Sequence, residues 1–485
     1  MVSFEPFDGS RFGAESLVVL PPEMSSVPSN TSFPETQPEQ GRLRHLSALL
    51  AAFLVVGSAC WGGYEWTRSL QDRYLHSVVA PEFSDAKLHG VAFLREAFLR
   101  PDTLVVFGSS ELLPTEPLNG IDFFRDFPTG FGLFPVGKPG TTALSVLQKI
   151  GSVGDAVSGK KVVISLSPAF FMYQRAEPKY FEGNFSELQA KEMLHSPYLS
   201  HGLKRDAARQ MLAYPRTYER DMVLRTLVRR LAKDRPRDRV LLALFEPVVW
   251  FDRWVSRLQD YAEVFVMLRE REEADEDAAA AEGKSLESPR SAGAKVRRRK
   301  LDWGELFRFA DRHARAMAVK AAEQAKALPP PKPKGSADEQ WLRVLRSSQE
   351  WDDFELVLRA LKELGAEALV MSMPLHGDLL ERDGVSADAR KEYGERLREL
   401  TGRYDTPLVY FSSHEGDPVF FKDKNDHIGS KGWWYYNKVI DDFFHGRLKS
   451  SDVAAKADGP SVAPPVPNES APEGAKPVPE SEKNR

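Results

Sequence analysis

The sequence predicts an α/β fold: a parallel sheet covered by helices, with a large helical insertion and one N-terminal transmembrane helix. Three observations predict it. Short β-branched runs alternate with helical patterns, one long stretch shows helical patterns alone, and one apolar segment near the N-terminus carries no charge. Strands that alternate with helices are typical of parallel sheets with helices on both faces. The hydrophobic fraction of 42% excludes a wholly disordered chain.

The apolar segment near the N-terminus is long enough, at about 1.5 Å per residue, to cross a hydrocarbon core. We therefore expect a transmembrane helix over 45–66, after a disordered cytoplasmic tail over 1–41 that is rich in proline and serine. A buried core helix or a signal peptide is the alternative, although signal peptides normally begin within the first few residues. Basic residues just before the segment favour a cytoplasmic N-terminus, which places the main domain (70–448) outside the cytoplasm.

The predicted strands are short apolar runs bounded by polar residues. The clearest are 103–107 and 161–166, and two more are expected at 367–374 and 406–413. These four runs supply the sheet.

Helical periodicity fills the spaces between the strands. Trp351, Phe354, Leu358 and Leu361 recur at steps of three and four residues, which predicts one face of a helix before the third strand. The stretch 175–350 shows helical patterns and an acidic run followed by a basic one, so we expect a helical insertion with a solvated charged segment.

Composition excludes several classes of function. The chain has 66 Lys+Arg against 70 Asp+Glu, whereas nucleic-acid binders usually show a basic excess. Its single cysteine, Cys60, excludes an intrachain disulfide framework and a thiolate zinc cluster. No metal-ligand spacing and no phosphate-binding glycine loop occurs, so we expect no metal and no cofactor. The C-terminal segment 449–485 is interpreted as a second disordered tail.

The first predicted strand is followed by Gly-Ser-Ser-Glu at 108–111. In an open α/β sheet, ligands bind outside the carboxyl ends of the strands, so a serine at this place is where a nucleophile would stand. An ordinary helix N-cap is the alternative interpretation, since serine commonly caps a helix that follows a strand.

The segment 420–434 favours the catalytic interpretation. It places His427 between Asp423 and Asp426 on one side and a predicted helix on the other. A serine hydroxyl needs an imidazole to accept its proton, and the imidazole needs a carboxylate to fix its tautomer. The two ends of the globular region supply these three groups. Four other histidines are interpreted as ordinary surface or core residues: His195, His201, His313 and His445.

Several segments, taken in order, resemble the DltD family, the D-alanine transfer proteins of teichoic-acid modification. They are Gly-Ser-Ser-Glu after the first strand, PVGKPGTTAL at 135–144, ISLSPAFF at 164–171, MPLHGDLLERDGVS at 373–386 and the aspartate–histidine segment that ends in Lys-Gly-Trp. The resemblance implies a single-pass membrane protein whose extracytoplasmic domain is similar to the SGNH/GDSL hydrolases, a three-layer α/β/α fold. It does not extend over the insertion.

The resemblance also implies catalytic roles. Ser110 corresponds to the nucleophile and His427 to the general base. The family usually places its aspartate three residues before the histidine, where this chain has Lys424. One extra residue in the loop would make Asp423 the partner, and we prefer it; Asp426 remains the alternative.

Donors for the developing oxyanion are expected from two backbone N–H groups, those of Ser110 and of a glycine in the second glycine block. Gly137 and Gly140 both qualify by residue type, and the resemblance favours Gly140; a simple turn glycine is the alternative. Ser167 stands where a third polar group of the site is expected.

The resemblance implies a membrane-anchored serine acyltransferase of the cell envelope that works through an acyl-serine intermediate. Its expected partners are a membrane-bound O-acyltransferase and an envelope polymer or glycan that accepts the acyl group. Two alternatives stay open, an esterase or thioesterase with the same triad and a non-catalytic scaffold for a membrane acyltransferase. The displaced aspartate motivates the scaffold alternative, and the sequence identifies neither the acyl group nor the acceptor.

Overall fold

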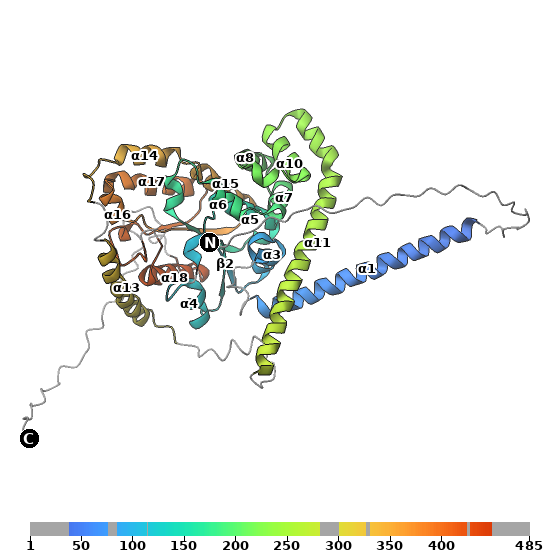
Figure 1. The fold of residues 1–485 in the computed structure, drawn as a ribbon, viewed down its shortest axis with the longest axis horizontal. Helices are drawn as coiled ribbons and strands as arrows, with labels where there is room; N and C mark the ends of the chain where they lie inside the picture. The colour runs from blue at the N-terminus through green and yellow to red at the C-terminus, as the bar shows by residue number, and fades with distance from the viewer. Residues whose placement is uncertain are drawn as a thin grey trace, which may run out of the picture. The chain divides into compact units, whose positions relative to one another are not determined.

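The fold is taken from a computed structural model (Figure 1). It describes residues 38–75, 85–113, 115–281, 300–325, 330–423 and 427–448. The chain divides into two compact units, one that ends at Trp61 and one that begins at Gly62. The predicted C-terminal tail and nearly all of the N-terminal one lie outside the described residues.

The second unit contains a five-stranded parallel sheet in the order β2-β1-β3-β4-β5, which confirms the predicted α/β class. The strands are β1 (Thr103–Phe107), β2 (Gly132–Val136), β3 (Lys161–Leu166), β4 (Glu367–Ser372) and β5 (Leu408–Tyr410). β1 and β3 have the predicted bounds, while β4 and β5 are shorter than predicted.

Strand β2 was not predicted, because its sequence GLFPV is short and contains Pro135. Proline lacks the N–H that a central strand needs and is therefore confined to sheet edges. β2 is an edge strand, and Pro135 lies opposite Val106 of β1. Edge placement explains why this strand tolerates a proline.

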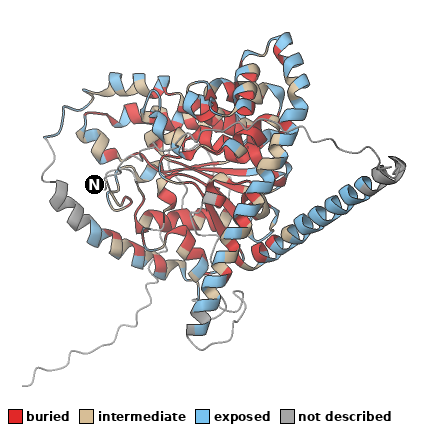
Figure 2. Ribbon diagram, turned by 45° about the vertical axis from the view of Figure 1, so that its right-hand side comes forward, coloured by how far each residue is buried: buried red, intermediate tan, exposed pale blue. Residues whose placement is uncertain are grey.

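The side chains of β1 alternate between two hydrophobic cores. Val105 and Phe107 belong to the core on one face of the sheet, and Leu104 and Val106 to the core on the other. Strands buried on both faces give continuous apolar runs instead of an apolar–polar alternation. Figure 2 shows the buried residues on both sides of the sheet.

Helices cover both faces. Those that contribute to the core containing Val105 include α2 (Asp85–His89), α3 (Ala92–Leu99), α5 (Ala143–Val153), α6 (Pro178–Asn184), α7 (Glu187–His195), α8 (His201–Met211), α9 (Pro215–Tyr218), α10 (Met222–Lys233), α11 (Pro236–Ala281), α14 (Asp338–Ser347), α15 (Glu350–Leu364) and α17 (Ala387–Arg403). Those that contribute to the core containing Val106 include α4 (Gly120–Asp126), α13 (Trp303–Ala325) and α18 (Ser430–Phe444). Short helical turns are η1 (Ser110–Leu112), η2 (Gly154–Val157), η3 (Pro168–Met172) and η4 (Ser412–His414), and α16 (Gly377–Arg382) follows β4.

Helix α15 is the one predicted from periodic apolar residues. Trp351, Phe354, Leu358 and Leu361 are all buried in the first core. The described part of 175–350 is helical almost throughout, but its helices do not form one cap. α13 packs Leu306 and Ala310 into the opposite core from the other insertion helices.

Helix α1 (Pro38–Tyr74) contains the apolar segment. The segment His45–Tyr74 is long and apolar enough to cross a membrane. Its most apolar stretch of 18 residues has a mean hydropathy of 1.8, and none of that stretch is buried. This candidate span covers the predicted transmembrane segment, and Cys60 is exposed within it.

Candidate active site

The turn after β1 carries the serine pair. The Gly108 N–H donates to the Val136 carbonyl of the neighbouring strand at 3.2 Å, so the turn begins in register with the sheet. A Cβ at position 108 would lie 2.4 Å from Oε1 of Glu111, so a larger residue there would have to displace that carboxylate. η1 then begins at Ser110. The serine is therefore fixed at the carboxyl end of a strand that has neighbours on both sides.

His427 lies on a short loop closed by backbone hydrogen bonds. Phe421 and Ile428 form an isolated antiparallel bridge. The Lys422 N–H donates to the His427 carbonyl at 2.7 Å, and the Gly429 N–H donates to the Phe420 carbonyl at 2.8 Å. α18 begins directly after this loop, as the sequence predicted.

Glu116, a buried carboxylate, ties the loop to the segment after the serine turn. The Ser430 hydroxyl donates to Oε2 of Glu116 at 3.1 Å, and the Lys422 ammonium lies 3.4 Å from Oε1. Because both contacts join segments that are far apart in the sequence, they set the distance between the serine turn and the histidine loop.

The structure brings three of the predicted residues together. Nε2 of His427 lies 2.8 Å from Oγ of Ser110, and Nδ1 of the same ring lies 2.8 Å from Oδ2 of Asp423. Asp426, the alternative partner, lies outside the described residues. A hydroxyl on one ring nitrogen and a carboxylate on the other is the arrangement that activates a serine for acyl transfer.

Comparison with known proteins identifies the family. A family model described as DltD protein matches residues 80–445. The chain belongs to the DltD family. Protein DltD of Bacillus subtilis (strain 168) is 27% identical over 367 residues, which are 74% of this chain and 87% of that protein. Protein DltD of Staphylococcus aureus (strain NCTC 8325 / PS 47) is 20% identical over 406 residues, 81% of this chain and 92% of that protein.

The electrostatics around His427 favour its charged form. The hydrogen bond to Asp423 is the largest cause of a raised pKa of the His427 imidazole, and partial burial opposes it. The raised pKa makes the ring a stronger proton acceptor for the Ser110 hydroxyl.

Glu111 lies next to Ser110 and is buried. Its Oε1 accepts the Ser109 N–H at 2.9 Å, which fixes the serine turn. Burial raises the pKa of the Glu111 carboxyl, and the hydrogen bond from the Ser109 N–H opposes that shift. The residue stands inside the Gly-Ser-Ser-Glu segment of this DltD family member, but the sequence analysis assigned it no role. Its position directly after Ser110 was the available signal.

The second glycine block runs beside the serine turn. A Cβ on Gly137 would lie 1.9 Å from the Gly108 carbonyl oxygen, so this close backbone approach requires glycine. Gly140 has a φ of 86°, and a Cβ there would lie 2.6 Å from the ring of Tyr180. The turn conformation thus accounts for Gly140 being glycine, and its role as an oxyanion donor stays a prediction.

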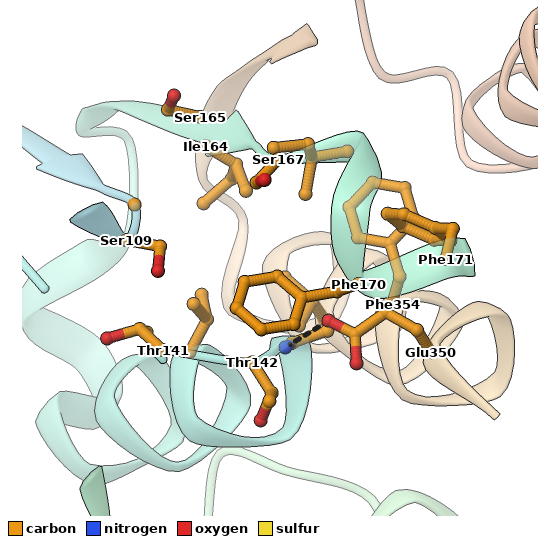
Figure 3. Close-up of a pocket in the computed structure, with 15 residues that line it drawn as sticks. Ser109, Thr141, Thr142, Ile164, Ser165, Ser167, Phe170, Phe171, Glu350 and Phe354 are labelled. Carbon is orange, nitrogen blue, oxygen red and sulfur yellow. Dashed lines mark hydrogen bonds between the residues drawn. The ribbon is translucent and has the colours of Figure 1, made fainter. Parts of the chain in front are cut away.

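A small cavity opens beside the serine turn (Figure 3). Its lining includes Ser109, Thr142 and Ser167 and three phenylalanines, Phe170, Phe171 and Phe354. Glu350 of α15 accepts the Ala143 N–H at the start of α5 at 2.7 Å, and burial raises its pKa to about 7. Ser167 lines the same cavity as Ser109, and its role as a third polar group of the site stays a prediction. Glu350 carried no local sequence signal.

The four other histidines pair differently. His195 contacts Glu246, His201 contacts Asp234 at 2.7 Å, His313 contacts Ser430 at 2.9 Å, and His445 contacts the Thr129 carbonyl at 2.9 Å. Within the described residues, His427 is the histidine bonded to a carboxylate through one ring nitrogen and to a serine through the other.

Proposed function

We propose that this protein is a membrane-anchored serine acyltransferase of the cell envelope that transfers D-alanyl groups, the activity its family resemblance implies. The observation that carries the proposal is the hydrogen-bonded series Ser110–His427–Asp423, with both distances at 2.8 Å. Membership of the DltD family supports D-alanyl as the transferred acyl group. The triad supports a mechanism with an acyl-serine intermediate.

The first step acylates the enzyme. His427 Nε2 accepts the Ser110 proton as Oγ attacks the carbonyl carbon of an ester or thioester donor. Collapse of the tetrahedral intermediate expels the donor alcohol or thiol, which takes the proton back from His427. Asp423 fixes the imidazole tautomer and stabilises the imidazolium. The Ser110 and Gly140 N–H groups are the proposed donors to the oxyanion.

The second step transfers the acyl group. A hydroxyl of the acceptor polymer gives its proton to His427 and attacks the acyl-serine carbonyl. The Ser110 Oγ leaves and recovers the proton from the imidazolium. The products are an ester on the polymer and the free enzyme, in which the proton of the acceptor hydroxyl now stands on Ser110.

Membrane anchoring by α1 fits this reaction. The basic residues before the span favour an N-terminus in the cytoplasm, so the proposed place of the main domain is outside it, in the periplasm or at the cell exterior. Tethering raises the effective concentration of a donor and an acceptor that are both held near the bilayer. A membrane-bound O-acyltransferase is the proposed donor-side partner, and an envelope polymer or glycan is the acceptor.

Hydrolysis is the second candidate function. The side chains of His427 and Asp423 are 29% and 34% exposed, so water can approach the base. An esterase or thioesterase would use the same triad with water as the acceptor. The scaffold alternative was motivated by the displaced aspartate, and the 2.8 Å contacts of His427 with Asp423 and with Ser110 speak against it.

The test is an acylation assay on the full chain in detergent. We expect a D-alanyl thioester to leave a mass adduct on the wild type and on Ser109→Ala, and none on Ser110→Ala. Addition of a hydroxyl-bearing envelope polymer should then discharge the adduct onto the polymer. An adduct on Ser110→Ala would refute the proposed nucleophile. Discharge to water at the same rate with and without polymer would favour the esterase.

A further inference from the structure

Helix α11 uses several charged residues to contact the body of the molecule. Its polar contacts to other elements include Asp252 with Lys191 at 2.9 Å, Arg253 and Arg257 with Glu192 at 2.6 Å each, and Asp260 with the Ala92 N–H at 2.7 Å. These contacts fix the helix against α7 and the start of α3, so its opposite side faces away from the protein.

That opposite side is apolar. It carries five apolar residues at steps of four, seven, three and four, a spacing that places them on one side of a helix. They are Val240, Leu244, Phe251, Trp254 and Leu258. We call these five residues the apolar stripe. All are exposed, from 45% for Leu258 to 74% for Leu244. A surface helix of a soluble protein normally has one apolar face, which is turned inward. Helix α11 has such a face too, since Val249, Val264 and Leu268 are buried in the core, so the exposed apolar stripe is an additional one.

The C-terminal continuation of the stripe is covered by the end of α1. Phe265 stands seven residues after Leu258 and packs its ring against Trp66, with centroids 5.3 Å apart. Tyr261 packs against Tyr64 with centroids 5.4 Å apart. The stripe is therefore the uncovered part of a face whose other part already holds the end of the candidate membrane span.

Helix α11 contacts the part of α1 that belongs to the second unit. The contacts extend from Tyr64 with Tyr261 to Arg73 with Glu272. In each helix, the residues that precede this contact in the sequence include exposed apolar ones: those of the candidate span in α1 and those of the apolar stripe in α11.

From these observations we infer that the apolar stripe of α11 docks on the lipid bilayer, with its side chains at the boundary between headgroups and acyl chains. This inference rests on the proposed anchoring by α1. The stripe extends over about 27 Å at 1.5 Å per residue. Trp254 and its exposed neighbour Trp250 suit the interfacial region, where indole rings concentrate. Arg235 and Arg237, exposed at the start of the helix, suit anionic headgroups.

Bilayer docking has a mechanical consequence. A single transmembrane helix leaves the attached domain free to rotate about it. A second contact along α11, held to the body by the Glu192 and Asp260 interactions, restricts that rotation. The active site would then keep a fixed orientation toward a membrane-held donor.

The test uses fluorescent probes on the full chain in liposomes of phosphatidylethanolamine and phosphatidylglycerol. Because Cys60 is the single cysteine, a Cys60→Ser background accepts one probe at a time. We would place nitrobenzoxadiazole at Leu244→Cys and Phe251→Cys in the stripe and at Ala51→Cys in the span. Met222→Cys, a 56% exposed apolar position on α10, is the matched control. Unfolding temperatures close to that of the wild type would verify that each variant folds.

We expect doxyl-labelled lipids to quench most of the emission at positions 244, 251 and 51, and aqueous iodide to quench position 222. Iodide quenching at 244 and 251 with lipid quenching at 51 would overturn the docking while leaving the anchor intact. Iodide quenching at 51 as well would refute the anchor and the docking together. Protection of 244 and 251 from both quenchers would overturn the docking in favour of a protein partner.

Discussion

Two histidine–aspartate pairs in the body of this protein have similar distances and different surroundings. Nδ1 of His427 lies 2.8 Å from Asp423, and Nε2 of His201 lies 2.7 Å from Asp234. Asp234 also accepts from Arg239 at 2.8 Å, so the carboxylate near His201 serves a surface ion-pair cluster. His427 instead presents its second nitrogen to the Ser110 hydroxyl at the carboxyl end of β1.

The comparison teaches that the carboxylate does not by itself make a catalytic histidine. Both rings have an aspartate, but only the ring of His427 is held against a serine turn at the carboxyl end of the sheet. The following predictions test that distinction.

The largest expected effect is that of Ser110→Ala. Removing the nucleophile of a serine triad typically lowers kcat by about a millionfold, so the acyl-transfer rate should fall to background. The matched substitution Ser109→Ala removes the neighbouring hydroxyl that lines the cavity and should retain the adduct. Equal rates for Ser110→Ala and the wild type would show that Ser110 is not the nucleophile.

Asp423→Asn should lower kcat by about ten-thousandfold, because the imidazole loses the group that fixes its tautomer. The control is Asp234→Asn, which alters the His201 pair with no serine beyond it and should leave kcat at its wild-type value. Steady-state kinetics on both variants measures the difference. If Asp423→Asn were as active as Asp234→Asn, Asp423 would not be the orienting residue.

In a plot of kcat/KM against pH, activity should fall on the acidic side with a midpoint above about pH 6.5, the ordinary pKa of histidine. Protonated His427 cannot accept the serine proton, and the Asp423 hydrogen bond raises the pKa of the imidazole above that ordinary value. Activity is therefore lost as the pH falls through the raised pKa. In Asp423→Asn, the midpoint of this acidic fall should lie at lower pH. The same midpoint in both proteins would contradict the claim that Asp423 raises the pKa of His427.

A smaller effect is expected at Glu111. Glu111→Ala removes the acceptor of the Ser109 N–H and leaves a buried donor unsatisfied, which costs about 1–3 kcal/mol of stability. Glu111→Gln keeps an amide oxygen as acceptor and should recover most of that loss. Denaturant unfolding of both variants measures it, and equal losses would show that the hydrogen bond is not what holds the turn.

The smallest effect is expected at His201. The His201 side chain is 45% exposed, and Arg239 still pairs with Asp234 when His201 is removed, so we expect a loss of roughly 0–1 kcal/mol, as for an exposed pair. His201→Ala should therefore shift the unfolding temperature slightly and leave acyl transfer unchanged. A large loss of transfer would show that the α8 region takes part in the reaction.

The sequence was sufficient for the parts of the fold and site that depend on local patterns. The bounds of β1 and β3 follow from uninterrupted β-branched runs, and the helical face of α15 follows from its apolar spacing. The resemblance supplied Ser110 and His427, and simple loop counting favoured Asp423.

The remaining features depend on contacts that join distant segments. Strand β2 was not predicted because it contains Pro135, which is acceptable only at a sheet edge. That β2 lies at the edge is known only from the strand order. The Glu116 contacts with Ser430 and Lys422 leave no local pattern. The outward direction of the α11 stripe likewise became visible only once Glu192 and Asp260 showed which side faces the body.

The measurement that tests the central claim most directly is fluorophosphonate labelling of the full chain, with the adduct mapped by peptide mass spectrometry. We predict an adduct on Ser110 that is lost in His427→Ala and retained in His201→Ala. An adduct on another serine, or equal labelling of His427→Ala and His201→Ala, would contradict the claim that His427 activates Ser110.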